Sequence, residues 1–207
     1  MPALTFDEFA ANAIQNGEVV NVLFEARLFE LIGVLHRVSS PLALEGVEHE
    51  LVGGLAVLVH VEEADPEHTM LTRDVDLLIR REDLDRVSQV TARHGFRFRH
   101  AAGLDMLCYG EGDRARNAVH LLYSGERVRE SQARPNPEIA PELKDVHGEI
   151  VRVIPVADLV AMKLGAWRLK DRVHIQSLDS AGLITREVEA SLPEDLAIRL
   201  AEVRASE

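Results

Sequence analysis

Two aspartates carry the clearest chemical signal in the sequence. Asp74 and Asp76 stand in the segment TRDVDLLIR, where they alternate with the apolar Val75, Leu77 and Ile79. Side chains two apart on a strand point to the same face, so we expect both carboxylates together. Two such carboxylates repel each other unless a cation lies between them, and oxygen ligands suit Mg²⁺ that also holds substrate phosphates. The pair indicates a site for Mg²⁺ or Mn²⁺; the alternative is two solvated acids at the start of a strand.

Two glycines upstream of the aspartates give this pair a context. Gly53 and Gly54 follow the apolar segment HELV and precede LAVLVHV, which is typical of a helix. Because they lack side chains, they allow backbone amides and a helix N-terminus to approach a phosphate. The alternative is that they only form a tight turn. Together with the aspartates they predict a phosphate cradle beside a metal.

A histidine on a later strand is a further candidate. His120 lies in NAVHLLYS and faces away from its neighbours Val119 and Leu121. A neutral imidazole can ligate a metal or accept a proton near neutral pH. A lone histidine among apolar residues is more often a hydrogen-bonded core residue. Both interpretations stay open from the sequence.

A basic segment near the C-terminus supplies the remaining candidates. Lys163, Trp167, Lys170, Asp171 and His174 follow one another at steps that place them on one face of a single predicted helix, which runs to about residue 182. We expect these cations on the protein surface. The alternative to a binding role is an ordinary solvated helix face, in which Asp171 balances its basic neighbours.

These segments together resemble the nucleotidyltransferase fold. The resemblance rests on LVGGLAVLVH, TRDVDLLI and DLVAMKLGAWRLKDRVHIQSL and covers residues 47–178. It is to the bacterial group that contains the abortive-infection, toxin-antitoxin type of nucleotidyltransferase. The resemblance implies that Gly53 and Gly54 hold the triphosphate of a nucleotide and that Asp74 and Asp76 bind a divalent metal. It also implies a third carboxylate on a neighbouring strand.

The chain departs from this family pattern on the strand of His120. The histidine stands where the third carboxylate is expected, and Asp105 and Glu126 are the substitute carboxylates, if they are not plain surface charge. The interval between the glycines and the first aspartate is also longer than usual in the family.

The basic segment matches the family pattern in part. Family members carry a lysine, then a Lys-Asp or Arg-Asp pair, then another acid. Lys163 and the pair Lys170 and Asp171 fit this order, which implies that they belong to the nucleotide site. A lysine there would stabilise the charge of the triphosphate or of its leaving group. His174 stands where the last acid is expected.

Length and composition bound the class of protein. The 207 residues, 46% hydrophobic and 28% charged, are typical of one compact globular domain. The net charge of −12 argues against nonspecific duplex binding. No apolar stretch reaches the ~20 residues that cross a bilayer, so no membrane span is expected. The single Cys108 and an opening segment unlike a signal peptide lead us to expect a cytoplasmic protein.

The elements that must position these residues form a mixed α/β (α+β) fold. We expect a helical N-terminal segment (1–40) divided near Asn16 and Gly17, followed by a loop from Ser39 to Gly46. A nucleotidyltransferase-like core with a mixed sheet (41–155) comes next, and a helical C-terminal portion (156–207) packs on it. The predicted strands are HELV, DVDLLIR, FRFRHAA, LDMLCYG, NAVHLLYS and EIVRVI; helices are predicted in LAVLVHV, in REDLDRVSQVTARHG and from about Pro193.

The predicted function is metal-dependent transfer of a nucleotide from a nucleoside triphosphate to an acceptor hydroxyl. Asp74, Asp76 and His120 are the predicted catalytic residues of an in-line displacement at the α-phosphorus. The acceptor stays open among RNA, a protein side chain and a small molecule, and the resemblance adds a toxin-like role with a cognate antitoxin. The alternative is a catalytically reduced nucleotide-binding or partner-binding module, which His120 and His174 favour.

Overall fold

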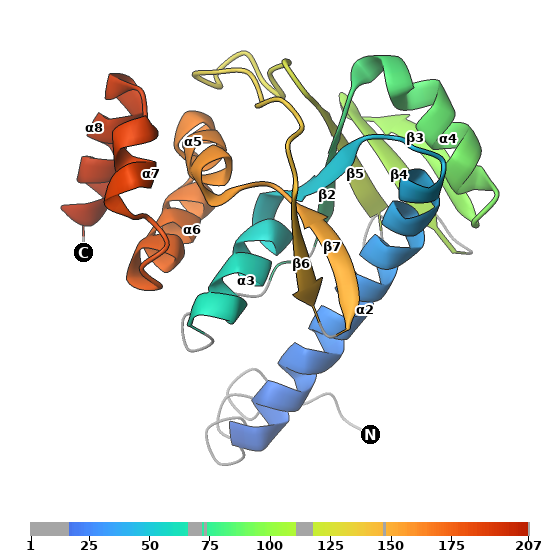
Figure 1. Cartoon of the computed structure of the whole chain (residues 1–207), viewed down its shortest axis with the longest axis horizontal. Coiled ribbons are helices and arrows are strands. Elements are labelled where there is room, and N and C mark those ends of the chain that lie inside the picture. The colour runs from blue at the N-terminus through green and yellow to red at the C-terminus, as the bar shows by residue number, and fades with distance from the viewer. Residues whose placement is uncertain (1–16, 66–71, 73, 111–117, 147, 207) are drawn as a thin grey trace.

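The computed structural model describes residues 17–65, 72, 74–110, 118–146 and 148–206 (Figure 1). The helices are α2 (Gly17–Leu44), α3 (Gly53–Ala64), α4 (Leu84–Ala92), α5 (Val156–Ala166), α6 (Leu169–Ser180), α7 (Arg186–Ser191) and α8 (Glu194–Arg204), with a 3-10 turn η2 (Arg81–Asp83). The strands are β1 (His49–Val52), β2 (Val75–Ile79), β3 (Phe96–Ala101), β4 (Leu104–Tyr109), β5 (Ala118–Tyr123), β6 (Glu142–Val146) and β7 (Glu149–Val153).

The strands form one mixed sheet of seven in the order β3-β4-β5-β2-β1-β7-β6. Strand β1 is antiparallel to β2 and parallel to β7, and β2 is parallel to β5. The remaining neighbours are antiparallel. Figure 1 shows helices α5 to α8 gathered at one side of the molecule, with α2 and α4 at the other. The predicted mixed sheet with helical N- and C-terminal parts is confirmed.

The two faces of the sheet are covered by different helices. His49 and Glu50 are neighbours in β1 and therefore point to opposite faces. His49 forms a 2.5 Å hydrogen bond with Ser39 of α2. The charge of Asp158 in α5 contributes to the raised pKa of Glu50, after the larger effect of burial. Asp76 pairs in β2 with the residue two positions after Glu50. Asp76 therefore points to the face of α5, away from α2.

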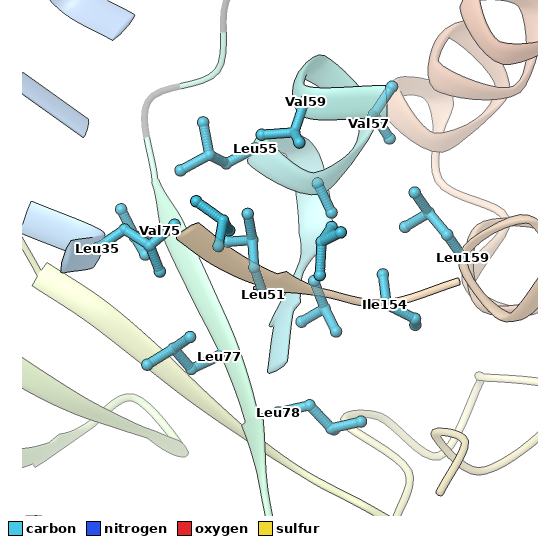
Figure 2. Close-up of a cluster of buried hydrophobic side chains, with 14 of the residues drawn as sticks. Leu35, Leu51, Leu55, Val57, Val59, Val75, Leu77, Leu78, Ile154 and Leu159 are labelled. Carbon is cyan, nitrogen blue, oxygen red and sulfur yellow. The ribbon is translucent and has the colours of Figure 1, made fainter. Parts of the chain in front are cut away.

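The hydrophobic core fixes the turn between β1 and α3. All four residues of β1 and the first nine of α3 are buried, and each fully buried aliphatic side chain contributes about 1.5–3 kcal/mol. Figure 2 shows side chains from α2, β1, α3, β2, α5 and the end of β7 in one cluster. The labelled members are Leu35, Leu51, Leu55, Val57, Val59, Val75, Leu77, Leu78, Ile154 and Leu159. This packing holds the glycine pair rigidly at the end of β1.

The N-terminal helix extends further than the sequence predicts. The loop expected from Ser39 is wrong, because α2 continues through Pro41 to Leu44. Proline removes one backbone donor and is disfavoured inside a helix, but the next residue, Leu42, is fully buried in the core. The helix ends at Leu44, and Gly46 follows it with a φ of +67°, which suits glycine. The division predicted near Asn16 lies outside the described residues.

The predicted single helix after residue 156 is also wrong. It breaks between α5 and α6, where Trp167 adopts a left-handed φ of +54° and its N–H bonds the carbonyl of Lys163 at 3.1 Å. The Trp167 ring is held by the guanidinium groups of Arg172 and Arg199, at 4.4 and 5.1 Å from its centroid. Asp171 then accepts the backbone N–H of residue 168 and begins α6. These contacts fix a corner that periodicity does not reveal.

Two short elements, β6 and α7, have no counterpart in the prediction. Strand β6 is an edge strand with mainly exposed residues, and α7 has no buried residue. Neither carries the apolar repeat on which sequence prediction depends. Among the described residues, no helix combines the length and apolar character needed to cross a membrane.

Candidate active site

The site begins where three strands lie side by side. Val52 at the end of β1 pairs with Asp76 in β2, and Asp76 pairs with His120 in β5. Gly53 follows Val52 directly and begins α3. The glycine turn, Asp76 and His120 are thus neighbours across the sheet. This is the proximity that a phosphate cradle beside a metal requires.

Gly53 lies against the carboxylate of Asp76. A Cβ atom at Gly53 would be 2.0 Å from Asp76 Oδ2, far inside contact distance, and the φ of Gly53 is +76°. Only glycine therefore fits at this position without a shift. The N-cap residue Val52 contributes no side-chain hydrogen bond to the first amides of α3. Since Gly53 is the first residue of α3, the turn places the N-terminus of α3 beside the carboxylate of Asp76.

Asp76 and His120 form a hydrogen-bonded pair. His120 Nδ1 is 3.0 Å from Asp76 Oδ1, and both side chains are about one-fifth exposed. The hydrogen bond with Asp76 raises the pKa of His120, burial opposes this rise, and the charges of Asp76 and Asp74 add to it. Asp74 is therefore within electrostatic reach of the same imidazole. His120 lies in the site rather than in the apolar core.

The second glycine is covered by two polar side chains. A Cβ at Gly54 would be 2.6 Å from Thr72 Oγ1 and 3.5 Å from His174 Cε1. Sequence reasoning missed Thr72, although it stands two residues before Asp74 and four before Asp76. This spacing is the signal that could have found it, because alternate residues of an extended segment share a face. The hydroxyl and the imidazole both lie against Gly54, although they come from segments far apart in the sequence.

Lys163 is buried, contrary to the expected surface position. Its side chain is only 4% exposed, and its Nζ lies 3.6 Å from Asp171 Oδ1. Burial lowers the pKa of Lys163 to about 8, while the charges of Asp171 and Asp76 oppose the decrease. The ammonium of Lys163 therefore lies within electrostatic reach of the Asp76 carboxylate. The break between α5 and α6 makes this burial possible, since it carries α6 back across the end of α5.

Asp171 holds the cations of this corner. It is fully buried and accepts hydrogen bonds from Arg168 Nε at 2.7 Å and Arg168 Nη2 at 3.0 Å. Burial alone would raise the pKa of Asp171, but the Arg168 hydrogen bonds and the Lys163 charge lower it overall. Asp171 has no exposed surface, and its contacts are with Lys163 and Arg168.

Arg168 and Lys170 lie at the start of α6, close to the carboxylates. The charge of Asp76 raises the pKa of Arg168, after the larger effect of its hydrogen bond with Asp171. Lys170 is exposed, and its charge opposes the raised pKa of His120. Arg168 was not predicted; its pairing with an acid three residues later is the signal that could have indicated it. The segments around residues 53, 76, 120 and 170 thus share one electrostatic environment.

The two substitute carboxylates lie elsewhere. Asp105 pairs with Leu121, the neighbour of His120, and so faces the opposite side of the sheet. It accepts hydrogen bonds from Tyr123 and from His100. Glu126, beyond the end of β5, is bound by Arg81 at 2.8 Å. Neither acid can serve as a third carboxylate for Asp74 and Asp76.

The donor set fits a magnesium ion that is shared with a substrate. Mg²⁺ is usually bound by one or two carboxylates, with phosphate oxygens and water completing its shell. Asp76 keeps Oδ2 toward the glycine turn because His120 engages Oδ1. In the described part of the chain, no group of three or more His, Cys, Asp or Glu side chains could hold a metal by itself. The arrangement therefore suits a metal that arrives with a phosphate.

Comparison with known proteins identifies the fold. No protein-family model matches the chain, and no curated protein matches it. It is similar to the solved structure of an antigenic nucleotidyltransferase-like protein from Paracoccidioides brasiliensis, with 15% identity, a TM-score of 0.56, and 86% of this chain and 88% of that chain covered. It is also similar to ANT(2'')-Ia in complex with adenylyl-2''-tobramycin, with 14% identity, a TM-score of 0.50, and 84% and 97% covered. The chain has a nucleotidyltransferase-like fold.

Proposed function

We propose that this protein is a metal-dependent nucleotidyltransferase that moves a nucleotide from a nucleoside triphosphate to an acceptor hydroxyl. The observation that carries the proposal is the contact between Gly53 and Asp76, which places a glycine turn at a helix N-terminus against a carboxylate. The fold supports it as well. The acceptor and the identity of the nucleotide are left to experiment.

The residues divide the binding of the triphosphate between them. The backbone amides of Gly53 and Gly54 and the N-terminus of α3 meet the phosphates, because a helix N-terminus favours negative charge. Lys163 adds a buried ammonium whose interaction with phosphate is strengthened by exclusion of water. Asp74 and Asp76 hold Mg²⁺ or Mn²⁺, which when bound supplies charge neutralisation at the phosphates.

His120 is proposed to accept a proton from the acceptor hydroxyl. Its Nδ1 donates to Asp76, which leaves Nε2 as the basic nitrogen, an arrangement with the logic of an aspartate-histidine pair. As the acceptor oxygen bonds the α-phosphorus, the bond to the pyrophosphate oxygen breaks and the hydroxyl proton moves to Nε2. The imidazole thus performs the task that a carboxylate would perform there.

Labelled triphosphates test the transfer. Each α-labelled nucleoside triphosphate is incubated with the protein, Mg²⁺ or Mn²⁺, and cell extract or total RNA, and label on any macromolecule or small molecule is measured. Label is expected with wild type and with Asp85→Asn, an exposed control on α4. Asp76→Asn, which keeps shape but loses a metal-binding charge, should abolish it. Label at the wild-type rate in Asp76→Asn would refute the site.

A second candidate function is a nucleotide-binding module without transfer. It is favoured by the engagement of Asp76 Oδ1 by His120 and by the position of Asp105 on the other face. Such a module would bind triphosphate in a manner that depends on Asp76 but would show no transfer, hydrolysis or self-labelling. The toxin-like role with a cognate antitoxin stays a prediction, which growth arrest on expression, relieved by Asp76→Asn, would test.

A further inference from the structure

The imidazole of His174 occupies an unusual position in the candidate active site. Its Cε1 would be 3.5 Å from a Cβ at Gly54, so the ring lies over the second glycine of the turn. Its Nδ1 is buried and has no hydrogen-bond partner among the described residues. A buried polar atom without a partner is uncommon and calls for a specific reason.

The electrostatic surroundings keep this imidazole neutral. The pKa of His174 is lowered to about 4, mainly by burial and next by the charge of Lys163, with Asp171 opposing the decrease. Lys170 and Arg168, also in this corner, act in the same direction as Lys163. A neutral imidazole carries one N–H and one lone pair. With the proton on Nε2, the enclosed Nδ1 is a lone pair, and Nε2 is left to donate to a ligand.

Because the ring at position 174 is neutral, it does not offset the positive charge of Lys163. Both oxygens of Asp171 already accept hydrogen bonds from Arg168, and Lys163 lies at the longer distance of 3.6 Å. A carboxylate at position 174 would give this ammonium a second acid and cancel its charge. An imidazole does not. This corner therefore keeps a cation and an N–H donor near the glycine turn.

We propose that His174 is a phosphate-binding residue, whose Nε2–H donates to a triphosphate oxygen above Gly54, next to the ammonium of Lys163. The inference rests on the proposed function and adds to it a contact that recognises the phosphate chain and not the base. It therefore predicts that the chain binds inorganic tripolyphosphate, and that His174 contributes equally to this binding and to the binding of a nucleoside triphosphate.

Substitutions at His174 separate a direct contact from a spacer. His174→Gln keeps an N–H donor of similar reach, His174→Phe keeps the ring without a donor, and His174→Glu adds a charge beside Lys163. His94→Phe, at an exposed histidine just after α4, is the control. Affinity for tripolyphosphate and for ATP is measured by calorimetry with Mg²⁺, and thermal unfolding of each variant confirms that it folds. His174→Leu replaces the Phe variant if the latter does not fold.

The expected result is a shared loss for both ligands. His174→Phe should bind about tenfold more weakly than wild type, as for a lost hydrogen bond to a charged group. His174→Gln should stay within about threefold and His174→Glu should fall below the Phe variant. Wild-type affinity in His174→Phe, while wild type binds both ligands, overturns the inference but not the proposed function. Failure of wild type to bind either ligand overturns both.

Discussion

A single added methyl group at Gly53 provides a direct test of the geometry of the site. Gly53→Ala introduces a Cβ whose ideal position is 2.0 Å from Asp76 Oδ2 and 2.8 Å from its Cγ. Non-bonded heavy atoms normally meet at about 3.5 Å. Asp76 or the turn must therefore move. Because Oδ1 of the same carboxylate is bound to His120 at 3.0 Å, the movement should also disturb that hydrogen bond.

The expected loss of stability has two parts. An alanine at a φ of +76° carries the penalty of the left-handed region, about 1–2 kcal/mol. The clash with Asp76 adds the cost of overpacking, about 1–3 kcal/mol. The free energy of unfolding should therefore fall by about 2–5 kcal/mol in Gly53→Ala. The two contributions can be separated, because another glycine of the chain would incur the left-handed penalty without a clash.

Gly103 is the matched control. It lies in the β3–β4 turn with a φ of +74°, and a Cβ there would meet nothing within 4 Å. Gly103→Ala should lose only the left-handed penalty. Urea unfolding measures both variants, and calorimetry with Mg²⁺ and a triphosphate measures binding. We expect Gly103→Ala to bind like wild type and Gly53→Ala to lose binding, since its methyl group lies where the phosphate and Asp76 should meet.

The reasoning fails if the two alanine variants behave alike. Equal losses of stability would mean that the carboxylate of Asp76 is not packed against Gly53. Unchanged triphosphate binding in Gly53→Ala, with wild-type binding established, would mean that the glycine turn is not the phosphate cradle.

Two further substitutions concern buried ionisable groups. Burial, with a smaller effect of Asp158, raises the pKa of Glu50 from 4.5 to about 7. Between these two pH values the folded chain keeps a proton on Glu50 that the unfolded chain releases. Stability is therefore lost as the pH rises from about 4.5 through 7. Between about pH 5 and 8, wild type should lose about 2–3 kcal/mol relative to Glu50→Gln in urea unfolding; parallel pH curves would contradict this. Lys163→Met should retain or increase stability, because burial disfavours the ammonium and Arg168 keeps Asp171 paired. Its affinity for tripolyphosphate should fall about tenfold, and unchanged calorimetric affinity would remove Lys163 from the site.

The parts of the site that could be predicted are those set by local periodicity. Asp74 and Asp76 alternate with apolar residues, so a strand with both acids on one face follows from the sequence alone. The glycine pair between an apolar strand and an apolar helix likewise predicts the turn at the end of β1. Each of these signals lies within about ten residues, where the period of the side chains decides the structure.

The parts that could not be predicted depend on contacts between distant segments. The side of the sheet on which Asp105 lies is fixed by the register of β4 against β5, and a shift of one residue would have reversed it. The break at Trp167 depends on Arg199, more than thirty residues later in the chain. Apolar spacing on either side of the break continues as in one helix, so the sequence offers no period change to mark it.

The break has a consequence for the chemistry of the basic segment. In one continuous helix, Lys163 and Asp171 would lie two turns apart, on the solvent side with the other charged residues. In the structure, α6 returns along α5 and brings Asp171 to 3.6 Å from Lys163 in a buried corner. Burial costs the ammonium its hydration, and Asp171, occupied by Arg168, compensates only in part. A cation held in this way gains most from an anionic ligand, and it lies within electrostatic reach of His174, whose ring lies over Gly54.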